Sequence, residues 1–135
     1  MSFMEKLNLN LFKFILIFFL TLSNLAFSET KIISYNAIEV GVTDGDSLRF
    51  GKERIRLFGI DAPEIKQICN DKFKKPYACG EEAKKNLDEF ILSASAAKKK
   101  IYCYYSERDK YNRILGECFW GETKKININR FMVLF

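Results

Sequence analysis

The sequence predicts a small α+β domain in which a short, OB-like closed β-sheet packs with helices. Three strand-like segments come first, an amphipathic helical segment follows, and two further strand-like segments form a hairpin. The 135 residues are 48% hydrophobic and 29% charged, which is typical of one globular domain. This composition excludes disordered, collagen-like and multi-span membrane proteins.

Residues 1–28 are typical of a secretory signal peptide. A lysine-containing start precedes an apolar run at 14–20, and small residues stand three and one positions before a cut after Ser28. The alternative is an uncleaved anchor, although the run is shorter than the roughly 20 residues that span a bilayer. We expect export to the periplasm or the medium, a single domain at 29–135, and membrane attachment only if the signal stays uncleaved.

Three consecutive strands are expected at the start of this domain. Segment 37–42 alternates between apolar and polar residues, and 47–50 continues the alternation. Gly51 and Lys52 then form a turn before 54–60, which is rich in residues that favour strands.

The second half of the domain is expected to supply the helices and a hairpin. A loop at 62–78 holds both prolines and leads to a helix at 80–91, whose start is acidic. Segments 101–105 and 114–120 predict the hairpin, and 126–135 is typical of the opening of a second helix. Helical spacing places five apolar residues on one face of the first helix: Ala83, Leu87, Phe90, Ile91 and Ala94.

Four cysteines in an exported chain favour disulfides over a metal site. A hairpin around the turn at 109–112 brings Cys103 and Cys118 opposite each other, so we favour that pair together with Cys69 and Cys79. The alternative is four separate buried thiols.

The net charge indicates little about function, whereas the absence of histidine excludes several kinds of catalysis. The formal charge of +5 favours an anionic partner only weakly. Because the chain has no histidine, Ser-His-Asp and Cys-His catalysis, imidazole-bound zinc and a histidine base are all excluded. The lysine run 98–100 is best interpreted as a solvated turn, with a nucleic-acid clamp as the alternative.

Two acidic loops, 44–47 and 61–64, follow neighbouring strands and form the first candidate site. Their oxygens can converge on a hard cation such as calcium, with Asp46 and Asp61 as the charged ligands. Each loop alone is also an ordinary turn signal. Arg56 lies in an apolar strand just before the second loop, where it can pair with Asp61 or with a bound phosphate.

In a straight strand Arg56 and Asp61 would point to opposite faces, because they are five residues apart. Their pairing therefore requires a kink in the chain, which Gly59 permits. A second candidate cluster, 109–113, supplies Arg113, and its alternative interpretation is a simple polar turn. The sequence contains no P-loop, dinucleotide-binding or nucleophile-elbow motif.

These motifs resemble the staphylococcal nuclease (thermonuclease) family. The matching residues are 44–47, 56–64, 109–113 and Asn129, within a resemblance that extends over 38–133. The resemblance implies a five-stranded OB-fold β-barrel with packed helices. It also implies a calcium-dependent phosphodiesterase whose partner is nucleic acid, DNA or RNA, with no obligate protein partner.

The resemblance further implies the calcium ligands and the base. Asp46, Asp61 and the backbone carbonyl of Ala62 would hold calcium, and Glu64 would be the general base or the group that orients water. Ala62 replaces a hydroxyl residue often found there, which a backbone ligand tolerates. A carboxylate is needed because calcium acidifies its bound water only weakly.

The same resemblance implies that Arg56 and Arg113 clamp the phosphate, where they would stabilise charge that develops on its oxygens. Lys110 and Tyr111 match positions near the nucleotide, although Tyr111 can equally pack on the barrel.

One departure concerns the C-terminal end. The family continues beyond the position of Val133, whereas this sequence stops at Phe135, so we expect a truncated C-terminal helix. The alternatives to an exported nuclease are a catalytically silent nucleic-acid-binding OB-fold module and a truncated inactive fragment. Carboxylates beside a polyanion favour hydrolysis, because a pure binder does not need them.

Overall fold

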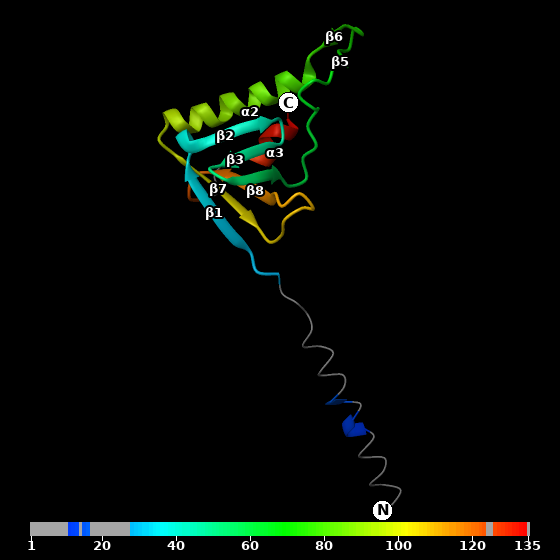
Figure 1. The fold of residues 1–135 in the computed structure, drawn as a ribbon, viewed down its shortest axis with the longest axis vertical. Helices are drawn as coiled ribbons and strands as arrows, with labels where there is room; N and C mark the ends of the chain where they lie inside the picture. Colours follow the sequence, from blue (N-terminus) through cyan, green and yellow to red (C-terminus); the bar gives the residue numbers. More distant parts are fainter. Residues whose placement is uncertain (1–10, 14, 17–27, 124–125, 135) are drawn as a thin grey trace, which may run out of the picture.

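Figure 1 shows the computed structural model of the chain, which describes residues 11–13, 15–16, 28–123 and 126–134. The signal peptide expected at 1–28 lies largely outside the described residues. Among the helices that are described, none combines the length and the apolar character needed to cross a membrane.

A mixed sheet of seven strands forms the body of the protein. Its order is β1, β7, β8, β4, β3, β2, with the short β9 paired to β8. Neighbouring strands are antiparallel except for β4 and β8, which are parallel. The strands are β1 (Lys31–Asn36), β2 (Val40–Asp44), β3 (Ser47–Phe50), β4 (Glu53–Leu57), β7 (Lys100–Tyr105), β8 (Ile114–Trp120) and β9 (Ile126–Asn127).

The expected five-stranded closed barrel differs from this sheet in closure and in strand number. Within the described residues β1 and β2 stand at opposite ends of the strand order and share no ladder, so the sheet is open. The first strand was expected at 37–42, but the short 3-10 helix η1 (Ala37–Glu39) occupies its start. The Glu39 carboxylate accepts hydrogen bonds from the backbone N (3.3 Å) and side chain (2.8 Å) of Asn36, which favours a turn over an extended strand.

Two helices accompany the sheet. The expected central helix is confirmed as α2 (Cys79–Ala96), which lies across the sheet beside β2 (Figure 1). The segment expected to open a second helix first forms β9 and then α3 (Ile128–Val133). Asn127 caps α3, because its side chain accepts a hydrogen bond from the backbone N of Arg130 at 2.9 Å.

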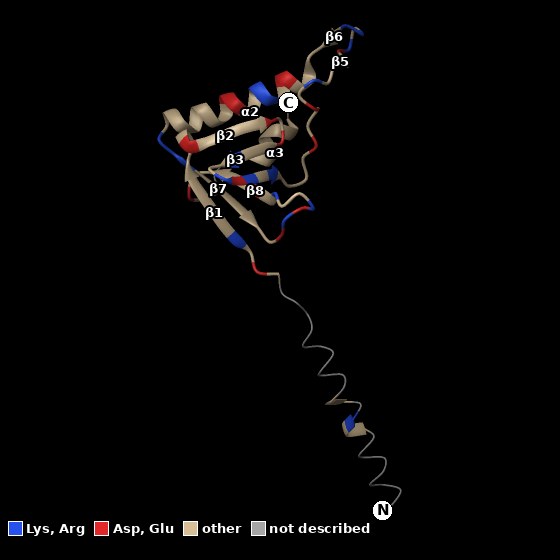
Figure 2. Ribbon diagram, in the orientation of Figure 1, with Lys and Arg blue, Asp and Glu red and all other residues tan. Residues whose placement is uncertain are grey.

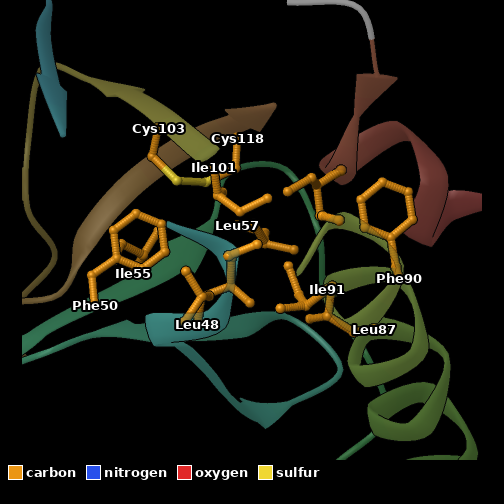
Figure 3. Packing of buried hydrophobic residues seen from close by; sticks show 14 of the residues in the cluster. Leu48, Phe50, Ile55, Leu57, Leu87, Phe90, Ile91, Ile101, Cys103 and Cys118 are labelled. Carbon is orange, nitrogen blue, oxygen red and sulfur yellow. A yellow bond between two sulfur atoms is a disulfide. The ribbon is translucent and has the colours of Figure 1, made fainter. Parts of the chain in front are cut away.

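The core lies between α2 and the sheet, as Figure 3 shows. Four of the five apolar helix positions are buried as expected, while Ala83 is half-buried. Each large apolar side chain that is fully buried stabilises the fold by about 1.5–3 kcal/mol. The strands contribute Leu48, Phe50, Ile55, Leu57, Ile101 and Ile114, and α2 contributes Leu87, Phe90, Ile91 and Ala94.

Both expected disulfides are present. Cys103 and Cys118 are direct partners in the β7–β8 ladder, and their bond lies inside the core (Figure 3). Cys69 and Cys79 join the loop after β4 to the first residue of α2. Cys69 is also the first residue of the short strand β5 (Cys69–Asn70), which forms a small ladder with β6 (Pro76–Tyr77) that projects from the body near the start of α2 (Figure 1).

Candidate functional site

The candidate site lies where the β2–β3 turn meets the loop that follows β4. Gly45 and Asp46 form the turn, and both are buried. A Cβ atom on Gly45 would lie only 2.7 Å from the Cβ atoms of both Ala62 and Ala83. A glycine is therefore required for the turn to fit between the loop and α2, and this close packing fixes Asp46 beside Ala62.

The Asp46 carboxylate is held by three donors. Ser47 Oγ donates to Oδ1 at 2.8 Å, while Ala62 N lies 3.3 Å and Arg56 Nη2 3.1 Å from Oδ2. Burial raises the pKa of Asp46, because only 6% of its side chain is exposed. The Ser47 hydrogen bond lowers this pKa and the neighbouring Asp44 raises it again, so burial decides the direction.

Arg56 joins the two acidic loops. Its Nη2 atom lies 3.1 Å from Asp46 Oδ2 and 2.7 Å from Asp61 Oδ1, and it also reaches the carbonyl of Ile60 at 3.4 Å. Gly59, at φ +74°, supplies the kink that opposite strand parity requires. Two carboxylates of contrasting exposure, 6% for Asp46 and 93% for Asp61, therefore meet at one guanidinium.

The donor set at this point suits a hard cation only in part. Within the portion of the chain that the structure describes, no group of three or more Asp, Glu, Cys or His side chains is arranged to hold a metal ion. Asp46 and Asp61 offer the carboxylate oxygens that calcium prefers, so backbone oxygens and water would have to complete its shell. The backbone N of Ala62 donates to Asp46 Oδ2, which places this residue beside the first carboxylate.

Glu64 lies in the same loop, and its backbone is held by two residues that the sequence motifs do not include. Gln67 Oε1 accepts a hydrogen bond from Glu64 N at 3.2 Å, and Gln67 N donates to Glu64 O at 2.7 Å. Gly80 N donates in turn to Gln67 O at 3.4 Å. A Cβ atom on Gly80 would collide with the carbonyl group of Glu64, so the first turn of α2 packs directly on this peptide. No spacing in the sequence indicates these contacts.

The turn at 109–113 is organised around Asp109. Its Oδ1 accepts from the backbone N of both Tyr111 and Arg113 at 2.9 Å, and its Oδ2 accepts from Arg113 Nε at 2.7 Å. Burial acts to raise the pKa of Asp109, but the bonds from Arg113 and Tyr111 outweigh it and hold this pKa below its usual value. Arg113 thus pairs with its own turn and not with Asp46 or Asp61.

Arg113 immediately precedes β8, the strand that pairs with the strand of Arg56. In the parallel β4–β8 ladder Ile55 is the partner of Ile114, and both are fully buried. Arg56 follows Ile55 within β4, so its side chain projects from the opposite face, whereas Arg113 precedes the first residue of β8 and belongs to the turn. The ladder therefore brings the turn that holds Arg113 to the edge of the strand beside β4.

Lys110 and Tyr111 are exposed at the tip of this turn. Lys110 Nζ lies 5.0 Å from the centre of the Tyr111 ring. Arg54 Nη2 donates to the Tyr111 carbonyl at 2.7 Å, and Arg108 Nη1 pairs with Glu53 Oε2 at 2.8 Å. These two contacts to β4, which the sequence does not predict, fix the turn beside the strand that carries Arg56.

Asn129 is buried, and the hydrogen bonds of its side-chain amide hold α3 to the sheet. Its Nδ2 donates to the carbonyls of Phe58 (2.8 Å) and Gly116 (3.0 Å), and its Oδ1 accepts from Cys118 N at 2.9 Å. It therefore ties α3 to β8 and to the first residue after β4.

Sequence comparison relates most of this domain to known proteins. A sequence model of the family described as staphylococcal nuclease homologue matches residues 54–134. The chain is 36% identical over 89 residues to the succinoglycan biosynthesis protein ExoI of Rhizobium meliloti (strain 1021), covering 66% of this chain and 44% of that protein. It is 33% identical over 98 residues to an uncharacterized endonuclease of Escherichia coli, covering 70% of this chain and 53% of the relative.

A similar uncharacterized endonuclease from Escherichia coli O157:H7 is 32% identical over 98 residues. The chain spans about half the length of these curated relatives. No solved structure shows significant similarity.

We predict that Gly80→Ala destabilises the protein by about 1–3 kcal/mol, because the added methyl group must displace the Glu64 peptide. In an unobstructed helix the same change would stabilise it by about 1 kcal/mol. Urea unfolding measures the sign, and hydrogen exchange of the Gln67 amide, which donates to Glu64 O, reports whether the loop has moved. Gly41→Ala, where the nearest atom to the new Cβ is 3.9 Å away, is the matched control. A stabilised Gly80→Ala protein with unchanged exchange would contradict this packing.

Proposed function

The chain belongs to the staphylococcal nuclease homologue family, and from this premise we propose that it is an exported, calcium-dependent nuclease that hydrolyses phosphodiester bonds of DNA or RNA. Two relatives that carry the name endonuclease support the reaction class. The observation that supports it most directly is the meeting of Asp46 and Asp61 at the guanidinium of Arg56.

Phosphodiester hydrolysis requires a water molecule in line with the leaving oxygen and stabilisation of the charge that develops on the phosphate. A guanidinium suits the second task, because its planar donors match two phosphate oxygens at once. Arg56 already lies at the junction of the acidic loops, and Arg113 immediately precedes β8, the strand that pairs with β4. Arg56 and Arg113 therefore act as the phosphate clamps in this proposal.

Asp46 and Asp61 would hold calcium, with the Ala62 carbonyl as a further ligand. When bound, calcium supplies positive charge beside the phosphate and a template for the substrate. The proton of the attacking water must then go to a carboxylate, since calcium acidifies water only weakly. Glu64 takes this role as general base or as the group that orients the water, and Gln67 and Gly80 hold its backbone in place.

The remaining parts of the proposal concern substrate contact and location. Lys110 and Tyr111 are exposed beside the strand that carries Arg56, where they can contact a nucleotide. The signal-like segment 1–28 supports export, and so do the two disulfides, because such bonds persist in oxidising compartments.

Incubation of residues 29–135 with single-stranded DNA, in calcium or in EGTA, tests the proposed function. We expect cleavage in calcium and none in EGTA, with activity restored when excess calcium is added back. Cleavage that ignores the chelator would overturn the calcium mechanism while leaving a nuclease. Binding of DNA without cleavage under either condition would instead favour a catalytically silent binding module.

We predict that Arg56→Ala and Arg113→Ala each lower kcat/KM by about 10²–10³-fold, equivalent to about 3–4 kcal/mol, because each removes a donor to the charged phosphate. Initial rates on a fluorescent oligonucleotide measure the loss. Arg49→Ala, which removes an exposed arginine from β3, is the matched control and should retain near-normal activity. An Arg113→Ala protein as active as this control would show that Arg113 only serves its own turn.

Glu64→Gln should retain calcium and oligonucleotide binding but lose most turnover, because the amide keeps the shape of the side chain and cannot accept the proton. Calcium titration by calorimetry and single-turnover cleavage separate the two effects. An equal loss of calcium affinity and of turnover would identify Glu64 as a metal ligand.

A further inference from the structure

We propose that residues 69–79, here called the arm, bind single-stranded nucleic acid by stacking a base on Phe73 and by placing phosphates against the arm's lysines. This inference rests on the proposed nuclease function and names a contact surface for its substrate. The arm extends from the body near the start of α2, and its lysines lie toward its tip (Figure 2).

The arm is held by a disulfide at its base and by hydrogen bonds at its tip. At its base the disulfide between Cys69 and Cys79 closes the loop. At its tip Asp71 Oδ1 accepts from the backbone N of Phe73 at 2.8 Å and of Lys75 at 2.9 Å. The backbone N of Asp71 also donates to Lys75 O at 2.9 Å. These bonds hold the backbone on both sides of Phe73 without any help from the hydrophobic core.

The composition of the tip suits a single strand. The Phe73 side chain is 78% exposed, so its ring serves no core, and Lys72 Nζ lies 5.1 Å from the ring centre. Lys74 and Lys75 follow directly, while the arm's one carboxylate, on Asp71, is occupied by backbone N–H groups. Aromatic rings among lysines bind unpaired strands, because each base has a face that stacks and each phosphate has a charge that pairs.

The position of the arm connects it to the candidate site. A cavity of about 770 Å³ separates the two, with Asp71, Lys75 and Tyr77 among its lining residues on the arm side. Asp61 and Pro63 line the same cavity from the loop after β4. A strand that crosses the arm is therefore led toward the carboxylate that meets Arg56. Bases paired inside a duplex are not free to stack on a protruding ring, so the arm favours single strands.

Two triple variants test the lysines. The arm variant changes Lys72, Lys74 and Lys75 to Gln. The control variant changes the three lysines at 98–100, just beyond the C-terminal end of α2, to Gln as well. Each removes three positive charges, and each includes one lysine with positive φ, 62° at Lys74 and 51° at Lys98. Fluorescence anisotropy with a fluorescein-labelled oligothymidylate in EGTA measures Kd over a range of salt concentrations.

We expect the arm variant to weaken binding on the order of tenfold, and to reduce the salt slope by about 0.7 for each phosphate that the arm no longer neutralises. The variant at 98–100 should remain close to wild type. An equal weakening in both variants would overturn the proposal, because it would reduce the effect to net charge.

Phe73→Ala tests the stacking. It should weaken binding of the single strand on the order of tenfold, whereas Phe73→Tyr should restore it and duplex binding should not respond. Ile38→Ala, at a side chain that is 80% exposed, is the matched control. If Phe73→Ala binds the single strand as tightly as the wild-type protein does, the proposed role of the arm is overturned.

The same proteins distinguish this proposal from the nuclease proposal. Arm-dependent binding without cleavage in calcium supports the arm and overturns the nuclease. If the wild-type protein cleaves and binds the oligonucleotide and no arm variant changes either property, the nuclease proposal is supported and the proposed role of the arm is overturned. A wild-type protein that neither binds nor cleaves the oligonucleotide overturns both.

Discussion

One guanidinium nitrogen, Nη2 of Arg56, contacts carboxylates from two different turns, and the site depends on this shared contact. A buried carboxylate such as Asp46 is costly to ionise without a partner, so the cation both stabilises that charge and draws Asp61 toward it. The β3–β4 register sets the geometry, because it places Arg56 directly opposite Ser47, the residue after Asp46. The position of Asp61 in turn decides where the rest of its loop begins.

From Asp61 onward the loop rests on α2 and not on the sheet. Gly45 admits the acidic turn against Ala83 of α2, and Gly80 admits the Glu64 peptide against the first turn of that helix. Because neither glycine has a side chain, the acidic turn and the loop after β4 can both pack directly on α2. The helix can support them because the same face, farther along, is anchored in the core through Leu87 and Ile91.

Features with a local cause could be predicted from the sequence. The α2 periodicity, the β7–β8 hairpin and the Cys103–Cys118 bond depend on near neighbours or on strand register, and all three are present. The first strand was placed wrongly even though the contact of Asn36 with Glu39 is local, because the apolar–polar alternation at 37–42 suggested a strand where η1 forms. The open edge was not predicted, because it depends on which distant strands pair. The acidic motifs pointed to residues that meet, but the pairing of Arg113 with Asp109, and the support of Glu64 by Gln67 and Gly80, depend on tertiary contacts that no spacing reveals.

The parallel pairing of β4 with β8 has a consequence for how the protein matures. Antiparallel neighbours such as β3 and β4 can form around a tight turn as soon as both are synthesised, whereas parallel neighbours need a long crossover. Here that crossover contains α2 and β7, so β8 docks only after most of the chain exists. The turn that holds Arg113 comes beside β4 when β8 docks. A nascent or partly unfolded chain can therefore hold both acidic turns and still lack one of the two proposed phosphate clamps, so the proposed chemistry requires the finished fold.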